Sequence, residues 1–198
     1  MNAARRAPLP ATTPVAREVR GTLIVTSLQM LRERGLIDRY RGLVDPAVRD
    51  EILGVVAATW VPVELIAAHY TACDQLGFTV PELLELGRGL TSRLHQPVFK
   101  VAVKLAGAAG VSPWALEPLL PRVWERMYRG GAIETTQLGP KDARVVIRGF
   151  PCASIAYSRI AWRGVLLGGV ELFASRVYVN EITGACDATT LAYRVSWA

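Results

Sequence analysis

The spacing of apolar residues changes from helical to alternating near the middle of the chain. Up to Gly131, apolar positions recur every three or four residues in segments that begin near proline or end at glycine, as in helices. After Ala132 the segments are shorter, contain more β-branched residues and alternate between apolar and polar positions, which is typical of strands. The chain therefore predicts a helical N-terminal half followed by a sheet-forming C-terminal half.

The predicted helices of the N-terminal half carry capping signals. Asp45 and Pro46 fit the N-cap and the first residue of a helix that is expected to run to about Thr59. Thr79 and Glu82 have the spacing of a capping box at the start of another helix. The other predicted helices cover residues 17–34, in which 22–26 can alternatively be extended, and residues 63–76, 96–109 and 112–129.

The C-terminal half is predicted to fold as strand–strand–helix–strand–strand. A turn signal at residues 139–142 separates two strand-like segments, which together predict a β-hairpin. A helix is expected from Pro151 to about Ala174, and alternating strands are expected over residues 175–183 and 190–197. The predicted fold class is α+β, with the helical N-terminal half packed on a four-stranded antiparallel sheet formed by a ββαββ C-terminal half.

The first sixteen residues differ in composition from the rest of the chain. They are rich in Ala, Pro, Arg and Thr, which predicts a disordered basic tail (1–16) before a single domain (17–198). Four arginines against one glutamate in the first twenty residues supply half of the net charge of +6. A basic arm can contact phosphates, but this one has no aromatic residue to stack on bases, so we expect no nucleic-acid binding.

Apolar residues are unusually abundant, at 51% of the chain with a mean hydropathy of +0.25. The most apolar runs, residues 52–65 and 165–173, are interrupted and fall short of the ~20 residues of a membrane span. Three cysteines without CxxC spacing, and no apolar leader after the first arginines, favour a cytoplasmic protein. The apolar excess then indicates a very full core, a cavity or an oligomer interface.

The sequence contains no recognisable catalytic or metal-binding motif. It lacks an HExxH helix, a glycine-rich phosphate loop and a Gly-x-Ser-x-Gly elbow, and Ser158 falls inside a predicted helix. Gly164, Gly168 and Gly169 lie in the same helix, where close packing against the sheet explains them best. His95 lies near a helix end, where compensation of the helix dipole accounts for it. We therefore expect no enzyme activity, no metal and no cofactor.

Aromatic residues provide the best candidates for a binding site. Rings with polar groups in an aliphatic interior are typical of apolar ligand pockets, although plain core packing is the favoured explanation. The candidate ligand-binding residues are Trp124, Tyr128, Tyr157, Arg159, Trp162 and His69. Tyr157 and Trp162 would orient a ligand, and Arg159 would pair with an acidic head group. His69 follows an apolar run, so it could hydrogen-bond a buried ligand or bind haem iron, although a hydrogen-bonded core residue is the favoured interpretation.

Short C-terminal motifs resemble a known ligand-binding fold. They are Arg148-Gly149-Phe150-Pro151, Trp162-Arg163-Gly164 with Gly168, Val177-Tyr178-Val179-Asn180-Glu181, and Tyr193-Arg194-Val195-Ser196-Trp197. In this order they resemble the four-vinyl-reductase domain, whose fold is shared with haem-nitric-oxide-associated proteins and with TRAPP vesicle-tethering subunits. The resemblance implies mixed helices with a four-stranded antiparallel sheet, often as a dimer, holding a small apolar ligand or a protein partner.

Motifs in the N-terminal half extend the resemblance over residues 17–197. They are Val19-Arg20-Gly21-Thr22, Leu31-Arg32-Glu33-Arg34-Gly35, Trp60-Val61-Pro62, Leu86-Gly87-Arg88 and Leu138-Gly139-Pro140. Together these motifs resemble a large paralogous family of myxobacterial proteins related to the same fold.

The resemblance does not extend to a zinc site. Some relatives hold zinc with two cysteines of the last hairpin, and this chain has Gly184 and Leu191 at the matching positions, which cannot coordinate zinc. Cys186 and Cys152 are the thiols nearby. Haem is not expected either, because no histidine falls inside a matched motif.

Two functions remain open from the sequence. The first is a non-enzymatic intracellular sensing or signalling domain with a cavity for a small hydrophobic molecule, placed between the helix of residues 113–128, the helix of residues 154–173 and the sheet. The second is an interaction module that forms a homodimer or joins a larger assembly, with the excess apolar surface at an interface.

Overall fold

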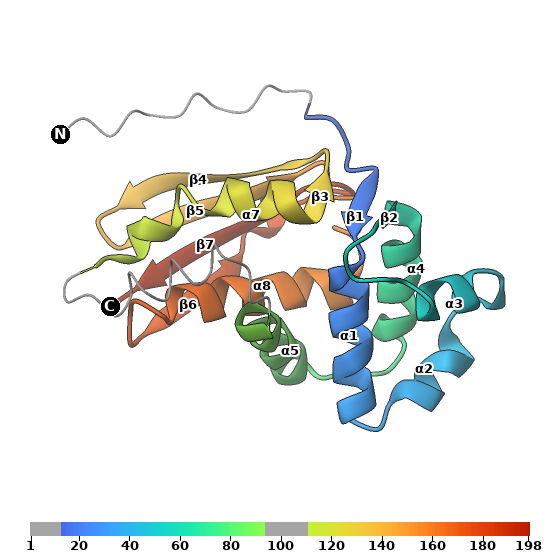
Figure 1. Cartoon of the computed structure of the whole chain (residues 1–198). Coiled ribbons are helices and arrows are strands. Elements are labelled where there is room, and N and C mark those ends of the chain that lie inside the picture. The colour runs from blue at the N-terminus through green and yellow to red at the C-terminus, as the bar shows by residue number, and fades with distance from the viewer. Residues whose placement is uncertain (1–12, 94–110) are drawn as a thin grey trace.

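The computed structural model describes residues 13–93 and 111–198. The predictions for residues 1–12 and 96–109, and for His95, lie outside this part. The described chain has the predicted α+β architecture: helices dominate up to residue 127, and a four-stranded antiparallel sheet forms in the C-terminal half (Figure 1). No helix in these two stretches is long and apolar enough to cross a bilayer.

The four-stranded sheet has the strand order β4-β5-β7-β6, and all neighbours are antiparallel. Its strands are β4 (Ala132–Gly139), β5 (Asp142–Arg148), β6 (Val177–Glu181) and β7 (Leu191–Trp197). The hairpin β4–β5 is confirmed, with a register shift between Gln137 and Gly139 next to the turn. Helix α8 (Ala156–Val170) connects the hairpin to β6, so the ββαββ order is also confirmed.

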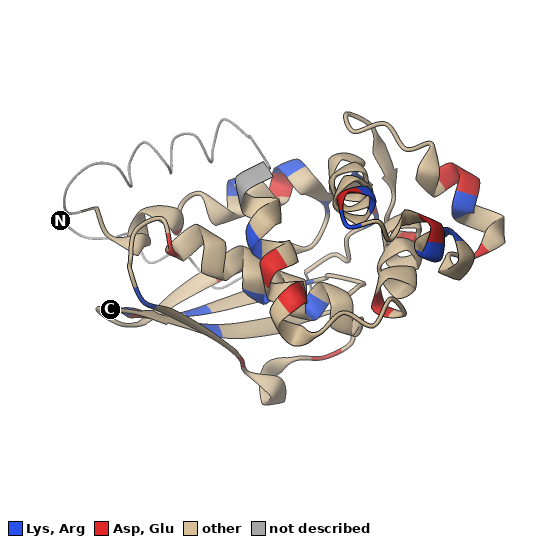
Figure 2. Ribbon diagram, turned by 90° about the horizontal axis from the view of Figure 1, so that it is seen from below, with Lys and Arg blue, Asp and Glu red and all other residues tan. Residues whose placement is uncertain are grey.

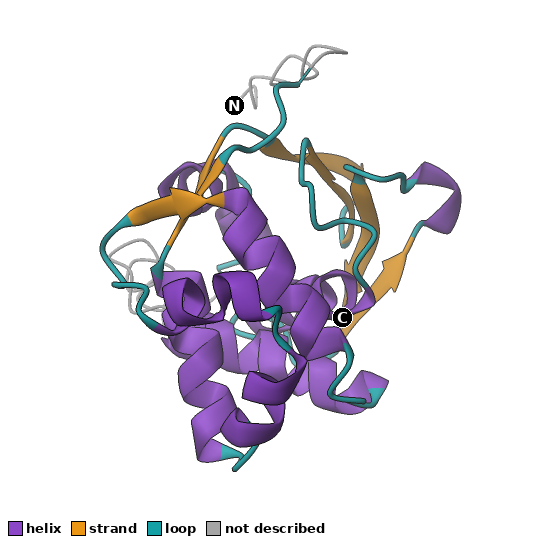
Figure 3. Ribbon diagram, turned by 90° about the vertical axis from the view of Figure 1, so that its right-hand side faces the viewer, coloured by secondary structure: helices purple, strands orange, loops and turns teal. Residues whose placement is uncertain are grey.

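One face of this sheet is covered by helices, as Figure 3 shows from the side. Because side chains alternate along a strand, the register that pairs Thr135 with Val145, and Val145 with Tyr193, places these three residues on one face. The opposite face carries ion pairs, including Arg194 with Asp142 at 2.6 Å. The covered face therefore positions the residues that can border an interior site.

A second sheet of three short strands joins distant parts of the chain. Its order is β2-β1-β3, from β1 (Glu18–Arg20), β2 (Trp60–Pro62) and β3 (Tyr128–Arg129). The prediction of a helix over residues 17–34 is wrong for its first residues, because β1 pairs with a strand on each side and Val19 is fully buried between them. Helix α1 (Thr22–Glu33) follows, so residues 22–26 are helical and not extended.

Residues 14–16 of the predicted tail are held by backbone hydrogen bonds. The amide of Ala16 donates to the carbonyl of Gly149 at 2.8 Å, and the carbonyl of Pro14 accepts from the amide of Gly131 at 2.6 Å. Ala16 is only 1% exposed. This segment therefore contributes to the packing around the start of β4 and the end of β5.

The N-terminal helices largely follow their capping signals. The Asp45 carboxylate accepts from the amide of Ala47 at 2.9 Å, and the amide of Thr79 donates to Glu82 at 2.7 Å, so both predicted caps are confirmed. The elements are α2 (Ile37–Leu43), α3 (Pro46–Leu53), α4 (Val63–Asp74) and α5 (Val80–Arg93). Helix α2 was not predicted, and α3 ends at Leu53 instead of near Thr59.

The helix predicted over residues 112–129 is wrong in its continuity. The structure has a short 3-10 helix, η1 (Pro113–Leu116), and a separate helix, α7 (Leu120–Met127). Pro118 and Pro121 lie between or at the start of these two elements. A proline inside a helix lacks the donor N–H and clashes with the preceding turn, so the segment breaks there.

Helix α8 packs against α5, and this corrects the expectation that its glycines pack against the sheet. Gly164 faces the backbone of α5 at Leu84 and Gly87, and Gly168 faces Arg88. Arg88 of α5 also joins the two helices electrostatically through Glu171 at the end of α8, and it pairs with Glu85 within α5. In Figure 2, acidic and basic residues lie close together along the helices.

Candidate functional site

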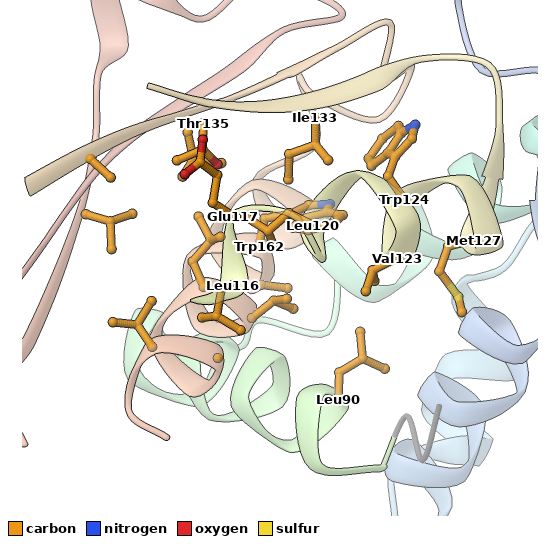
Figure 4. Close-up of a pocket in the computed structure, with 18 of the residues that line it drawn as sticks. Leu90, Leu116, Glu117, Leu120, Val123, Trp124, Met127, Ile133, Thr135 and Trp162 are labelled. Atoms are coloured by element: carbon orange, nitrogen blue, oxygen red, sulfur yellow. The ribbon is translucent and has the colours of Figure 1, made fainter. Parts of the chain in front are cut away.

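An apolar cavity of about 110 Å³ lies between η1, α7, α8 and the covered face of the four-stranded sheet. Figure 4 shows the side chains that converge on it from these elements. This is the position expected from the sequence. The residues that define its walls include Trp114, Leu116, Leu120, Val123, Trp124, Met127, Ile133, Ala143, Val145, Ala161, Trp162, Val165, Val170, Val195 and Trp197.

Regular spacing aims these side chains inward. On α7, the lining residues Leu120, Val123, Trp124 and Met127 follow the three- and four-residue spacing of one helix face. On the sheet, the lining residues alternate along each strand, and Ile133 with Thr135 on β4 is an example. A helix face and a sheet face thus meet across a space that neither fills.

Stacked aromatic rings form one end of the cavity. The ring centroids of Trp124 and Tyr128 are 4.2 Å apart with nearly parallel planes, and Trp162 lies 5.9 Å from Trp124. Phe150 meets Trp124 edge-on at 6.0 Å from behind this group. Such contacts hold the rings in fixed positions, so the wall they form is preformed.

The structure separates the predicted site residues into two groups. Trp124, Tyr128 and Trp162 line the cavity. Tyr157 projects from another side of α8 and contacts Ser27 on α1 at 3.2 Å. Arg159 forms an ion pair with Glu181 at 3.2 Å and is not among the lining residues, so the structure does not place it where it would meet a ligand head group.

His69 belongs to a buried hydrogen-bond chain in the helical half. Its Nδ1 lies 2.8 Å from the hydroxyl of Tyr40, and its Nε2 lies 2.8 Å from the hydroxyl of Ser27, which in turn contacts Tyr157. Burial lowers the pKa of the imidazole to about 3. A neutral ring with one donor and one acceptor nitrogen satisfies both hydroxyl partners, so His69 has the geometry of a structural core residue.

Most polar side chains around the cavity form hydrogen bonds with other groups of the protein. The indole N–H of Trp114 donates to the carbonyl of Pro140, and that of Trp124 donates to the carbonyl of Gly130, both at 2.9 Å. Tyr70 and Tyr128 share a hydrogen bond, and burial raises the pKa of both phenols. Ser158 donates to backbone carbonyls of its own segment.

Two polar side chains at the cavity were missed by sequence reasoning. Thr135 on β4 lines it, and within the described chain its buried Oγ1 has no hydrogen-bond partner. Glu117, an exposed residue directly after η1, also lines it. The alternation of Ile133 and Thr135 was the available signal for the first, whereas Glu117 follows a broken helix that was predicted to be continuous.

Metal ligands do not gather anywhere in residues 13–93 and 111–198. No three His, Cys, Asp or Glu side chains there are arranged to hold an ion. All three cysteines are free thiols; Cys73 and Cys152 are buried, and Cys186 accepts a hydrogen bond from the amide of Ala192 in the last hairpin.

Comparison with solved structures relates this fold to H-NOX domains. An Fe(II) unliganded H-NOX protein from K. algicida has a TM-score of 0.65 at 8% identity, over 90% of this chain and 96% of that one. A mutant of T. tengcongensis H-NOX has a TM-score of 0.57 at 12% identity, over 90% and 97% of the two chains. An oxygen-binding H-NOX domain related to soluble guanylate cyclases, solved as its oxygen complex, has a TM-score of 0.54 at 13% identity, over 90% and 94%.

These identities are low, so the likeness concerns the fold. It agrees with the part of the sequence resemblance that pointed to the fold of haem-nitric-oxide-associated proteins. No family model matches the chain, and no curated protein matches it.

Proposed function

We propose that this protein is a non-enzymatic binding domain for a small hydrophobic molecule, with a role in intracellular sensing or signalling. The observation that carries the proposal is the preformed apolar cavity between α7, α8 and the sheet, with Trp124 and Trp162 in its wall. A cavity of about 110 Å³ is close in size to the roughly 150 Å³ apolar cavity that binds benzene in another protein. The H-NOX fold and the resemblance to four-vinyl-reductase domains add support.

A catalytic role has less support from the same cavity. Ser158 is the lining residue with a nucleophilic hydroxyl in a deeply buried position, and that hydroxyl donates to the carbonyls of Cys152 and Ile155. No histidine lies among the described residues around the cavity to act as a general base. Binding without a chemical step is therefore the function that this geometry favours.

Haem, whose distortion or redox potential is the subject of some of the H-NOX structures, does not fit the described lining. A cavity of about 110 Å³ is near the size that holds benzene, and a porphyrin is several times larger than benzene. Its described lining includes no histidine or cysteine to ligate iron, and no lysine or arginine to pair with the carboxylates of a porphyrin. Tyr70 and Tyr128 line the cavity, but burial raises the pKa of both phenols and so disfavours the phenolate that would bind iron. Met127 would be a weak ligand, and His69 lies elsewhere with both ring nitrogens engaged.

Binding of ethylbenzene tests the proposal directly. The ligand is titrated into the protein while tryptophan fluorescence and the melting temperature are recorded. Ala161, which lines the cavity, is replaced in the variant Ala161→Leu, and Ala47, an exposed residue of α3, is replaced in the matched control Ala47→Leu. We expect saturable binding to the wild type and to the control, and much weaker binding to Ala161→Leu. A wild-type protein that binds no apolar probe would overturn the proposal.

A further inference from the structure

One hydroxyl in the cavity wall forms no hydrogen bond within the described part of the protein. Thr135 lies on β4, an edge strand, and its backbone is paired with Val145 on the neighbouring strand. Its Oγ1 is buried, yet among the described residues this atom finds no hydrogen-bond partner. A buried polar atom without a partner costs about 1–3 kcal/mol. Valine or isoleucine would fill this strand position without that cost, as Ile133 does two residues earlier.

The surroundings of Thr135 make it the polar point of an otherwise apolar wall. Ile133, Ala143 and Val145 are its neighbours on the same sheet face, and all of them line the cavity. The indoles of Trp114 and Trp124 already donate to backbone carbonyls. Among the buried side-chain N and O atoms of the described lining, the Oγ1 of Thr135 is thus the one without a partner, and a polar atom of a ligand would supply that partner.

An exposed carboxylate influences which polar group would be accepted. Glu117 lines the cavity from the residue after η1 and is the charged side chain of the described lining. In Figure 4 the labelled Thr135 and Glu117 are drawn toward one end of the cavity, with Trp124 and Met127 toward the other. A negative charge disfavours an anionic ligand nearby, and a carboxylate can only accept hydrogen bonds.

From this arrangement we infer that the cavity selects a neutral apolar molecule that bears a hydroxyl group, with the hydroxyl at Thr135 and the apolar body against Trp124 and Trp162. This inference rests on the proposed function and specifies its ligand class. A hydroxyl can both donate and accept, so it matches Thr135 and tolerates the acceptor Glu117. It also replaces the sequence-based expectation of an acidic head group paired with Arg159, whose guanidinium is engaged by Glu181.

Three probes of similar size test the inference: benzyl alcohol, ethylbenzene, in which a methyl group replaces the hydroxyl, and benzoate. They are titrated into the wild type and into Thr135→Val, which removes the hydroxyl and keeps the shape of the side chain. Valine suits a strand, so the variant is expected to fold, and circular dichroism checks this. We expect Thr135→Val to lower the affinity for benzyl alcohol about fivefold, which corresponds to the free energy of one hydrogen bond. The affinity for ethylbenzene should stay the same or rise slightly.

A second variant tests the role of the charge. Glu117→Gln keeps the length of the side chain and removes its charge. We expect wild-type protein to bind benzoate more weakly than benzyl alcohol, and Glu117→Gln to strengthen benzoate binding about threefold without changing the affinity for ethylbenzene.

The outcomes separate the inference from the function on which it rests. If Thr135→Val lowers the affinities for benzyl alcohol and ethylbenzene equally, or lowers neither, the inference is overturned while the proposed function stands. Tighter binding of benzoate than of benzyl alcohol by the wild type also overturns it. If the wild type binds none of the three probes, the proposed function fails and the inference fails with it.

Discussion

Gly87 of α5 and Gly164 of α8 bring the backbones of the two helices into contact. A β-carbon on Gly164 would lie 2.9 Å from the Cα of Gly87, and a β-carbon on Gly87 would lie 2.8 Å from the Cα of Gly164. Both distances are too short for a methyl group, and the neighbouring atoms belong to the backbone, so they cannot move aside. This crossing holds α8, and with it one wall of the cavity, against the helical half.

Replacement of either glycine should therefore destabilise the protein. We expect Gly164→Ala to lower the free energy of unfolding by about 1–3 kcal/mol, the usual cost of overpacking, because the two helices must separate. Chemical denaturation measures this. Gly42→Ala is the matched control: Gly42 lies in α2 with no atom near its missing β-carbon, so alanine there should be neutral or stabilising. An equal effect at both positions would contradict the proposed contact.

A methyl group at Gly169 should stabilise the protein, in contrast to one at Gly164, and it should reduce ligand binding. Gly169 lines the cavity from α8, and a β-carbon there would be 3.8 Å from Leu116, an ordinary contact. Alanine is favoured over glycine in a helix by up to about 1 kcal/mol, so Gly169→Ala should raise the melting temperature. The methyl group also occupies space in the cavity, so the affinity for ethylbenzene should fall. A fluorescence titration that shows unchanged affinity would argue against binding in this cavity.

Stability should decrease in mild acid because of His69. Its pKa is lowered to about 3 in the folded protein by burial, against 6.5 for the free group. Between these values the unfolded chain binds a proton that the folded protein does not, so the free energy of unfolding falls as the pH falls. One such proton corresponds to ~1.4 kcal/mol per pH unit.

Urea denaturation at pH 6, 5 and 4 measures this slope. His69→Gln, which cannot titrate, is expected to be less stable at neutral pH and to show a shallower slope over this range. The acidic groups with lowered pKa values, such as Asp142 and Asp187, are common to both proteins and cancel in the comparison. Identical slopes would show that His69 is not buried in its neutral form.

Haem should not bind with a defined axial ligand, because the described cavity is small and its lining contains no histidine or cysteine. When haemin is added to the purified protein, we expect an absorption spectrum that matches non-specific association. The control is Ala161→Leu, which narrows the cavity and should give the same spectrum. A sharp Soret band with one haem per chain, lost in Ala161→Leu, would reverse the conclusion on haem.

The ring of Trp60 on β2 contacts one side chain from each of the other two strands of the small sheet. The guanidinium groups of Arg20 and Arg129 lie 4.2 Å and 4.4 Å from its ring centroid, and Arg129 also pairs with Glu18 at 2.8 Å. Trp60→Leu should cost about 1–2 kcal/mol, because two cation–π contacts are lost. A double-mutant cycle with Arg20→Met should give a coupling of about 0.5–1 kcal/mol. A coupling of zero would show that the ring packs without an electrostatic contribution.

Local signals in the chain predicted the elements where neighbouring residues decide the conformation. The caps at Asp45 and Thr79 were found because a side chain within three residues satisfies the first amides of a helix. Strand β1 was missed because three residues are too few to show alternation, and because its partners lie far away along the chain, in β2 and β3. Its conformation depends on pairing that spacing along the chain does not record.

The candidate site was predictable to a similar extent. Trp124 and Trp162 were predicted to bind a ligand because their rings bring polar groups into an aliphatic interior. Both line the cavity. Arg159 was predicted to pair with an acidic head group of a ligand because of its charge, but it forms an ion pair with Glu181. Glu117 and Thr135 carried no local signal strong enough to select them from other polar residues.

Residue spacing and composition were enough to establish a helical half, an antiparallel ββαββ half and an excess of apolar side chains. The contact of Gly164 with Gly87 instead of the sheet, and the space left between α7, α8 and the sheet, became visible only when the elements were packed together. Apolar spacing shows which face of an element is buried, because that face must leave water. It does not show which element packs against that face, or whether the two surfaces meet without a gap.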